Sequence, residues 1–389
     1  SGEKNRIQIN ENSRFKMKIN KKGKVYFFIV FSEELSGSVV LLRTLVKTLE
    51  SNGFVCHLIF LTGKRAELFD GNSLFYIEEI LGEVKLWPNK MLFVRRRIVN
   101  LVIQFYILWK SKKHDEYIII YNAVNSIPKE GGMNNLIKGK KYVWIHESKY
   151  LLNLHGENLK KIKNQNFEFL VSSQIALKDL KDYLPKNKSY KIHFIGSAID
   201  SCNIIKVQNG NKVLINGYMD WNKGSDLILP LLKLVLNKIP DVIFKVVVSN
   251  DSSQSFSNFK NDMSRLGLTN KNIEIHQSLK NSEDIYNDAK ICLILSRNES
   301  LSLVGLESMF REIPFLFFDG CGGPEEIVGN NSLFSVPFLE LYSMSERIID
   351  LYTNVGSFMQ AKNYIKILKK EKYTTNQLLV RFQRATANN

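Results

Sequence analysis

The chain of 389 residues carries 54 basic and 38 acidic side chains, a formal net charge of +16, and 44% of its residues are hydrophobic. This length predicts roughly two to three domains, and the charge predicts an anionic partner, either a phosphorylated substrate, a membrane surface or nucleic acid. No RNP-type, zinc-finger or helix-turn-helix pattern accompanies the charge, so we expect no nucleic-acid partner. The four cysteines have no metal-site spacing and no apolar run reaches transmembrane length, so we expect a cytoplasmic protein.

The first half of the chain has the pattern of a parallel α/β domain. Residues 1–23 are polar and basic and are expected to form a tail. An amphipathic helix is predicted at 39–50, and Asn52-Gly53 is a helix stop. Short apolar runs predict strands at 24–31, 54–61, 117–121, 141–145 and 167–172. This βαβ opening is typical of a Rossmann-like domain.

A second α/β series is predicted to begin near Lys191. Its strands are expected at 212–216, 242–248, 273–276, 291 onward and 314–318, and its helices at 226–237, 258–266, 282–289 and after 343. The predicted fold class is therefore α/β, with two Rossmann-like domains that face a central cleft. We place the domains at 24–198 and 199–360, followed by a helical segment at 361–389 that can pack back on the first domain.

Two glutamates stand at the end of a predicted central strand. Glu299 lies in the polar break after the apolar run from Ile291, and Glu307 lies in the first turns of a helix that begins near Ser302. Ligands of open α/β sheets bind at the carboxyl ends of the strands, and a helix N-terminus there favours a phosphate. A sugar diphosphate needs both carboxylates and N–H donors, although two glutamates at this spacing are also common as ordinary loop and helix residues.

Four further features follow predicted strands. Gly37 lies in the first strand-to-helix turn, where a glycine allows a ligand close to the backbone. His146 closes a strand and is placed for ligand contact or proton exchange. Lys223 precedes a helix and can neutralise phosphate charge, or it is a solvated surface lysine. The Gly322-Gly323 turn leads into a helix with a proline near its first position.

Residues 95–113 combine an apolar stretch with basic ends. Arg95, Arg96 and Arg97 precede the stretch, and Lys110, Lys112 and Lys113 end it. This pattern is typical of an interfacial helix that meets anionic lipid. A core helix of the first domain with solvated basic ends explains the pattern equally well.

Taken in order, these features resemble the retaining GT-B glycosyltransferases of family 4. The resemblance runs from about Lys24 to the last helix and is strongest over residues 296–328, SRNESLSLVGLESMFREIPFLFFDGCGGPEEIV. That segment is similar to the pattern E-x-F-G-x-x-x-x-E-A-M followed by G-G-x-x-E-I-V. The resemblance implies a metal-independent, hexosyltransferase-type enzyme without cofactors, whose co-substrate is a nucleotide sugar, with UDP- and GDP-sugars favoured. It also implies a glycan or lipid-linked acceptor and a role in bacterial surface polysaccharide synthesis, with a peripheral position at the inner membrane face.

Roles are carried over only to matching positions. The resemblance implies that Glu307 binds the donor ribose, that Glu299 contacts the donor sugar and that Lys223 neutralises the diphosphate. His146 matches the histidine near the transferred sugar, and Gly37 matches the loop glycine near the phosphates. The remaining donor-binding positions implied are Gly217, Tyr218, Leu301, Ser302 and Leu303.

Two positions depart from the family pattern. Tyr218 stands where the family usually has arginine, so one of two phosphate-binding cations is missing. Either Lys223 suffices, or another basic residue such as Arg297 substitutes, or activity is reduced. Ser302 replaces the usual glycine, which is a mild change. The departure at Tyr218 keeps a second hypothesis open, namely a non-catalytic GT-B-like subunit that binds an acceptor or a partner glycosyltransferase.

Overall fold

The computed structural model describes residues 24–387, with gaps at 32–35, 63–68, 70–72, 84–87, 89–90, 128–136, 138, 158, 160–166, 187–188, 201–203, 208, 250–251, 270, 278, 280, 330 and 369. The predicted tail at 1–23 therefore lies outside the described residues. So do Cys202 and most of the break after the first strand.

The first domain is built on a seven-stranded parallel sheet with the order β3-β2-β1-β4-β5-β6-β7. The interior strand β1 has six consecutive buried residues because helices cover both faces of the sheet. The strands are β1 (Lys24–Phe31), β2 (Val55–Thr62), β3 (Ser73–Tyr76), β4 (Glu116–Asn122), β5 (Lys140–Ile145), β6 (Phe167–Val171) and β7 (Ile192–Phe194). The helices are α1 (Gly37–Ser51), α2 (Ile77–Leu81), α3 (Leu92–Ser111), η4 (Val124–Ser126), α4 (Lys149–His155) and α6 (Gln174–Tyr183).

The second domain is built on a six-stranded parallel sheet with the order β10-β9-β8-β11-β12-β13. The strands are β8 (Lys212–Gly217), β9 (Ile243–Val248), β10 (Ile273–Gln277), β11 (Ala289–Ile294), β12 (Phe315–Phe318) and β13 (Ser335–Val336). The helices are η5 (Ser225–Leu227), α7 (Ile228–Leu236), α8 (Gln254–Arg265), α9 (Ser282–Tyr286), α10 (Leu303–Phe310), α11 (Gly323–Val328), α12 (Leu341–Thr353) and α13 (Val355–Ile367).

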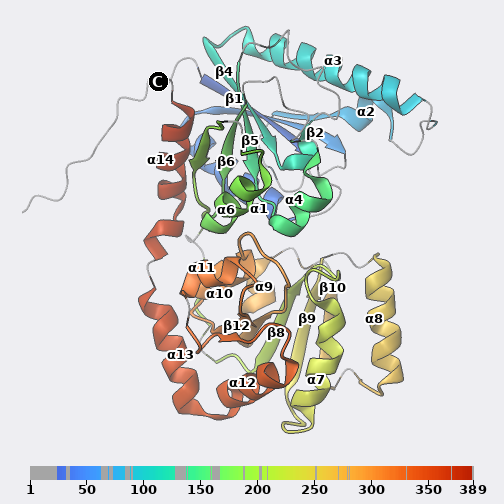
Figure 1. Cartoon of the computed structure of the whole chain (residues 1–389), viewed down its shortest axis with the longest axis vertical. Coiled ribbons are helices and arrows are strands. Elements are labelled where there is room, and N and C mark those ends of the chain that lie inside the picture. The colour runs from blue at the N-terminus through green and yellow to red at the C-terminus, as the bar shows by residue number, and fades with distance from the viewer. Residues whose placement is uncertain are drawn as a thin grey trace, which may run out of the picture.

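The chain returns to the first domain at its C-terminal end. After α13, the short helix η6 (Lys370–Tyr373) leads to α14 (Thr375–Thr386), which runs beside the first domain in Figure 1. Leu378 and Phe382 are buried in the core between α1 and the first sheet. Lys24 Nζ donates to the carbonyl oxygen of Thr386 at 3.0 Å. The last helix therefore joins the two domains by packing as well as by covalent connection.

Two sequence-based expectations are corrected. The segment near Lys191 does not open the second series, because β7 pairs with β6 and completes the first sheet. The helix expected at 282–289 ends at Tyr286, and Asp288 binds Lys245 Nζ at 2.8 Å while β11 begins at Ala289. Lys245 is 3% exposed, so its charge requires a carboxylate from this turn.

Candidate functional site

Glu299 is held at the carboxyl end of β11 by backbone pairing. Its amide donates to the Cys321 carbonyl at 2.7 Å, and its own carbonyl accepts from the Gly323 amide at 2.9 Å. A Cβ on Gly323 would lie 2.7 Å from Leu301 Cα, and Gly322 has a φ of +104°. The Gly322-Gly323 turn therefore holds the loop that carries Glu299, since no larger residue fits there without displacing the backbone.

The helix that follows begins where the sequence predicts. Ser302 is the N-cap of α10, and its hydroxyl accepts from the Gly305 amide at 3.1 Å. A cap of this kind satisfies one of the first-turn N–H groups and leaves others to face a ligand. Serine in place of the usual glycine therefore has a structural role here, as the N-cap of α10.

Glu299 and Lys223 form an ion pair. Lys223 Nζ lies 2.7 Å from Glu299 Oε1, and the Ser296 hydroxyl donates to the same carboxylate oxygen at 2.6 Å. The Glu299 side chain is 10% exposed and that of Lys223 is 33% exposed. The structure thus brings together two predicted site residues that lie 76 positions apart in the sequence, and it places a cation on the loop that leads into α10.

Arg297, the suggested substitute for the arginine that the family pattern has at position 218, is bound to residues of its own domain. Its guanidinium binds both oxygens of Asp226, at 2.9 and 2.8 Å, and also donates to the Trp221 carbonyl. The same group lies 4.4 Å from the centre of the Trp221 ring. These contacts hold the turn at 221–226 and leave Arg297 engaged within its own domain. The suggestion that Arg297 serves as a phosphate-binding cation is therefore not supported.

Gly217 ends β8, and Tyr218 opens the loop that leads to Lys223. A Cβ on Gly217 would meet no atom within 4 Å, so the space beside this backbone is open. Tyr218 is half-buried. The loop is closed by Asp220, whose carboxylate accepts from the Lys223 amide at 2.8 Å. This hydrogen bond fixes the backbone of Lys223 relative to β8.

His146 lies at the carboxyl end of β5 in a fixed hydrogen-bond chain. Asn122 Nδ2 donates to the Ser38 carbonyl at 3.4 Å, so Asn122 Oδ1 is the atom that accepts from His146 Nε2 at 2.9 Å. The Ser172 hydroxyl, which accepts from Trp144 Nε1 at 2.8 Å, lies 3.1 Å from His146 Nδ1 and donates to it. Burial lowers the pKa of His146 to about 3. At neutral pH the ring is therefore uncharged, with its proton on Nε2.

Glu147 supports this histidine and was not predicted from the sequence. One carboxylate oxygen accepts from the Val124 amide at 2.6 Å, and the other accepts from the His146 amide at 2.9 Å. Glu147 is 7% exposed, and burial raises the pKa of its carboxyl group. The sequence signal for this role is a glutamate directly after a histidine at the end of a predicted strand. Between Asn122 and Val124, Ala123 has a φ of +87°, which is strained for a residue with a side chain.

Glu307 lies one turn into α10, on the side that faces β8. Its half-buried carboxylate is close to the buried hydroxyl of Tyr286, beside Asn216 at the end of β8. Burial raises the pKa of Glu307, and the neighbouring Tyr286 hydroxyl and the Arg311 guanidinium oppose that rise. The neighbours of Glu307 are therefore different from those of Glu299, which pairs with Lys223.

The candidate residues of the two domains meet across the cleft. Leu301 and Leu303 pack against the core of the first domain as well as the second. A Cβ on Gly37 would lie 3.3 Å from Leu303 Cδ1, so the N-terminus of α1 faces the N-terminus of α10. The leucine side chains thus serve as interdomain contacts, while their backbone amides remain the predicted ligand-binding groups.

Hydrogen bonds also join the two domains near His146 and Glu299. The Ser300 hydroxyl donates to the His146 carbonyl, and Ser173 donates to the Ser300 carbonyl at 2.5 Å. Glu326 accepts from the Gln174 amide at 2.8 Å, at the N-terminus of α6. The loop that carries Glu299 is therefore bonded directly to the strand end that carries His146.

The described residues contain neither a cluster of metal ligands nor a membrane-spanning helix. No group of three or more His, Cys, Asp or Glu side chains within the described ranges is arranged to hold a metal ion. None of the helices described is both long enough and apolar enough to span a bilayer. The thiols of Cys56, Cys292 and Cys321 are buried.

Comparisons with known proteins agree with this geometry. Residues 203–369 match the family model of the glycosyl transferases group 1. A curated relative from Haemophilus influenzae, an uncharacterized glycosyltransferase, is 22% identical over 273 residues, which cover 63% of this chain and 73% of the relative. The family match supports a glycosyltransferase of the group 1 type.

Solved structures share the whole fold at low sequence identity. HepE of Anabaena, solved with UDP and glucose, has a TM-score of 0.72 at 12% identity and covers 93% of this chain and 98% of its own. TarM of S. aureus has a TM-score of 0.69 at 14% identity, with coverages of 94% and 99%. Sucrose-phosphate synthase of Thermosynechococcus elongatus has a TM-score of 0.73 at 13% identity, with coverages of 93% and 98%. The predicted fold class is confirmed: the chain has the GT-B fold.

Proposed function

We propose that this protein is a retaining, metal-independent glycosyltransferase of family 4 that moves a sugar from a nucleotide-sugar donor to a glycan or lipid-linked acceptor. The observation that carries the proposal is the Lys223–Glu299 pair, at 2.7 Å, in which Glu299 belongs to the loop that leads into α10. Ser300 of the same loop is hydrogen-bonded to the His146 carbonyl. A cation and helix-end amides stabilise the charge of a leaving diphosphate. A carboxylate stabilises positive charge that develops on the sugar ring.

The reaction breaks the bond between the anomeric carbon and the phosphate oxygen of the donor. The acceptor oxygen forms its bond to that carbon on the same face, and its proton passes to the leaving phosphate. Lys223 and the first-turn amides of α10 hold the departing diphosphate, Glu307 binds the ribose and Glu299 contacts the sugar. Interdomain contacts at Leu301 and Leu303 exclude water that would otherwise hydrolyse the donor.

A UDP-sugar is our preferred donor, and surface polysaccharide synthesis is our preferred context. HepE was solved with UDP-glucose, and another structure of the same fold is a lipopolysaccharide outer core galactosyltransferase, WaaB. These proteins share the fold at 13% identity, and we use their substrates only to choose which donors to test first. GDP-sugars form the second group of donors to screen.

The test measures UDP release and sugar transfer from UDP-glucose and related donors by the purified protein. We expect Glu307→Ala to abolish UDP-induced thermal stabilisation and to reduce transfer strongly. Glu346→Ala, a change at an exposed glutamate of α12, is the matched control and should behave as wild type. Equal turnover by the Glu307 and Glu346 variants would rule out the assignment of the donor site.

One observation favours a second candidate function, a non-catalytic subunit. Tyr218 occupies the position of a phosphate-binding arginine, and Arg297 is committed to Asp226. A subunit of this kind would bind neither UDP nor GDP. Calorimetric titration with both nucleotides separates the two functions, because the enzyme must bind at least one of them.

We also propose that α3 holds the protein against an anionic membrane. One face of α3 packs on the first domain through Ile103 and Ile107, yet the opposite face exposes large apolar side chains. Phe105 is 69% exposed and Trp109 is 62% exposed. The interfacial and core interpretations of this segment therefore each describe one face of the same helix. An exposed apolar stripe on a helix favours an interface between lipid and water.

The basic residues around α3 support a lipid partner. Arg96 and Arg97 are exposed near its start, and Lys112 and Lys113 are exposed just after its end. Arg95 is different, because it is 6% exposed and donates to the Gly82 carbonyl at 2.8 Å. Four cations at the ends of an apolar stripe suit anionic headgroups. In Figure 1 the helix lies on the outer side of the first domain, away from the second domain.

Flotation with vesicles tests the membrane part. We expect binding to phosphatidylcholine vesicles that contain phosphatidylglycerol and little binding to phosphatidylcholine alone. The double change Phe105→Ser and Trp109→Ser should abolish flotation, whereas Leu266→Ser, at a residue 39% exposed after α8, should not. Absence of flotation of the wild-type protein on the anionic vesicles would refute this proposal without affecting the donor site.

A further inference from the structure

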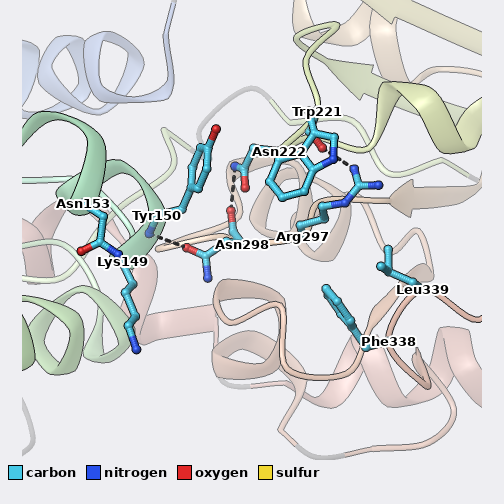
Figure 2. A pocket seen from close by; sticks show the side chains of 9 residues that line it. All are labelled: Lys149, Tyr150, Asn153, Trp221, Asn222, Arg297, Asn298, Phe338 and Leu339. Atoms are coloured by element: carbon cyan, nitrogen blue, oxygen red, sulfur yellow. Dashed lines mark hydrogen bonds between the residues drawn. The ribbon is translucent and has the colours of Figure 1, made fainter.

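A pocket of about 350 Å³ lies beside the Lys223–Glu299 pair, between the two domains. Figure 2 shows that α4 supplies one wall through Lys149, Tyr150 and Asn153. The second domain supplies the rest through its loops after β8, β11 and β13. The volume is at the lower end of the range for small-ligand pockets, ~300–1,000 Å³.

The pocket adjoins the candidate reaction centre through the chain itself. Asn222 and Asn298 line it, and Lys223 and Glu299 are the next residues in the sequence. The Tyr150 amide donates to Asn298 Oδ1 at 3.3 Å, so the first domain is bonded to this lining. The two loops that carry the ion pair therefore also form part of the pocket lining.

The lining combines aromatic rings with amide side chains. Trp221 is 56% exposed and Phe338 is 49% exposed, so both rings are accessible to a ligand in the pocket. Tyr150 lies against Trp221 with ring centroids 5.8 Å apart. Ring faces attract the polarised C–H groups on the apolar face of a sugar, and the amides of Asn153 and Asn298 can exchange hydrogen bonds with its hydroxyls.

Two features of the lining point to a ligand. Asn222 is 9% exposed and its Nδ2 donates to the Asn298 carbonyl at 3.0 Å, yet its Oδ1 has no hydrogen-bond partner among the described residues. An unpaired buried amide oxygen costs about 1–3 kcal/mol, which a ligand hydroxyl can relieve. Leu339, at the other side of the pocket, has a φ of +62°. Strained backbone of this kind clusters at binding sites.

The nucleoside of the donor does not occupy this pocket in our assignment. Glu307, the ribose-binding candidate, lies beside Tyr286 and Asn216, at the β8 side of β11. Phe338 follows β13, which is the edge strand on the other side of β11. A ribose at Glu307 therefore directs the base away from the pocket.

We propose that this pocket is the acceptor subsite and binds a saccharide unit, stacked on exposed aromatic rings and hydrogen-bonded by the asparagines. The inference rests on the proposed glycosyl transfer for its biological role, although saccharide binding can be measured without it. It adds side chains of the second domain, above all Phe338, Trp221 and Asn222, to the acceptor-binding surface. The sequence-based interpretation placed acceptor binding mainly in the first domain.

Saturation-transfer NMR with maltotriose, cellotriose and chitotriose, each in the presence of saturating UDP, tests the inference. We expect saturation transfer to at least one trisaccharide. The double change Asn153→Ala and Phe338→Ala should weaken its apparent affinity about tenfold, or about 1.4 kcal/mol. Tyr342→Ala is the matched control, because Tyr342 is an aromatic residue with 64% exposure outside the pocket lining.

Each outcome decides the inference. Absence of saturation transfer to all three trisaccharides overturns it, and so does a signal that UDP displaces or that the double variant retains. UDP-induced thermal stabilisation is measured on the same samples and reports the donor site separately. A protein that binds a trisaccharide at this pocket but no nucleotide would overturn the proposed function and leave the saccharide site standing.

Discussion

Replacement of Lys223 by alanine separates the structural role of this residue from its proposed catalytic role. In the structure Lys223 Nζ lies 2.7 Å from Glu299 Oε1, and the Ser296 hydroxyl donates to the same oxygen at 2.6 Å. Alanine therefore removes a cation that neutralises a carboxylate with 10% exposure. It also removes the cation proposed to stabilise the leaving diphosphate.

The two roles predict effects of different size. The Lys223 side chain is 33% exposed, so solvent screens the pair and its loss costs about 1 kcal/mol of folding free energy. That cost corresponds to a decrease of a few degrees in Tm. Loss of a preorganised group that stabilises transition-state charge lowers kcat about 10²–10³-fold, or about 2.7–4 kcal/mol.

The assay compares UDP release and Tm for Lys223→Ala, Lys223→Arg and Lys233→Ala. Lys233 lies on the exposed side of α7 and serves as the matched control for loss of one positive charge. We expect a small change in Tm and a large loss of turnover for Lys223→Ala, with partial recovery in Lys223→Arg. A turnover of Lys223→Ala within about threefold of wild type, a barrier change under ~1 kcal/mol, would refute the proposed role.

Three further predictions concern the residues that build the site. Gly323→Ala places a Cβ 2.7 Å from Leu301 Cα, so we expect a loss of about 1–3 kcal/mol in urea unfolding and weaker UDP binding. Arg311→Met removes the guanidinium that lies 2.7 Å from the Glu283 carboxylate. Because the Arg311 side chain is 1% exposed, we expect the free energy of unfolding to fall by about 3 kcal/mol. The additional change Glu283→Gln should restore part of this stability. His146, whose pKa burial lowers from 6.5 to about 3, is protonated in the unfolded chain first, so Tm should fall as pH decreases through that interval. His146→Gln should flatten this dependence, and an unchanged slope would contradict the assignment.

The positions of most strands along the chain can be predicted from short apolar runs, and so can the positions of the candidate residues that follow these strands. Segments such as 24–31 and 291 onward are apolar throughout because helices cover both faces of each sheet. Parallel strands place their carboxyl ends at one edge, which is why residues after different strands were expected to converge. His146, Lys223 and Glu299 do lie at such ends. The second α/β series is predicted too early, near Lys191, because the three partly buried residues of β7 carry no strong strand pattern. The predicted domain boundary at residue 198 nevertheless leaves β7 in the first domain.

The contacts between these residues could not be predicted from the sequence. Whether Lys223 meets Glu299, or Arg297 meets Asp226, depends on the conformations of the loops between strand and helix. The contact of Leu303 with Gly37 depends on the orientation of two separately folded domains. Local sequence patterns constrain neither the loop conformations nor the orientation of the two domains, because both are set by packing between residues far apart in the chain.

The state of His146 limits the routes for the acceptor proton in the proposed reaction. With a pKa of about 3, the ring is too weak a base to accept a proton near neutral pH. Glu299 is bound to Lys223, and Glu147 is buried with both oxygens bonded to backbone amides. The remaining base next to the acceptor oxygen is the phosphate that leaves, whose negative charge rises as the bond to the sugar breaks. In the proposed reaction we therefore expect transfer on the donor face, with His146 as a neutral hydrogen-bonding group, rather than a mechanism that uses a protein side chain as general base.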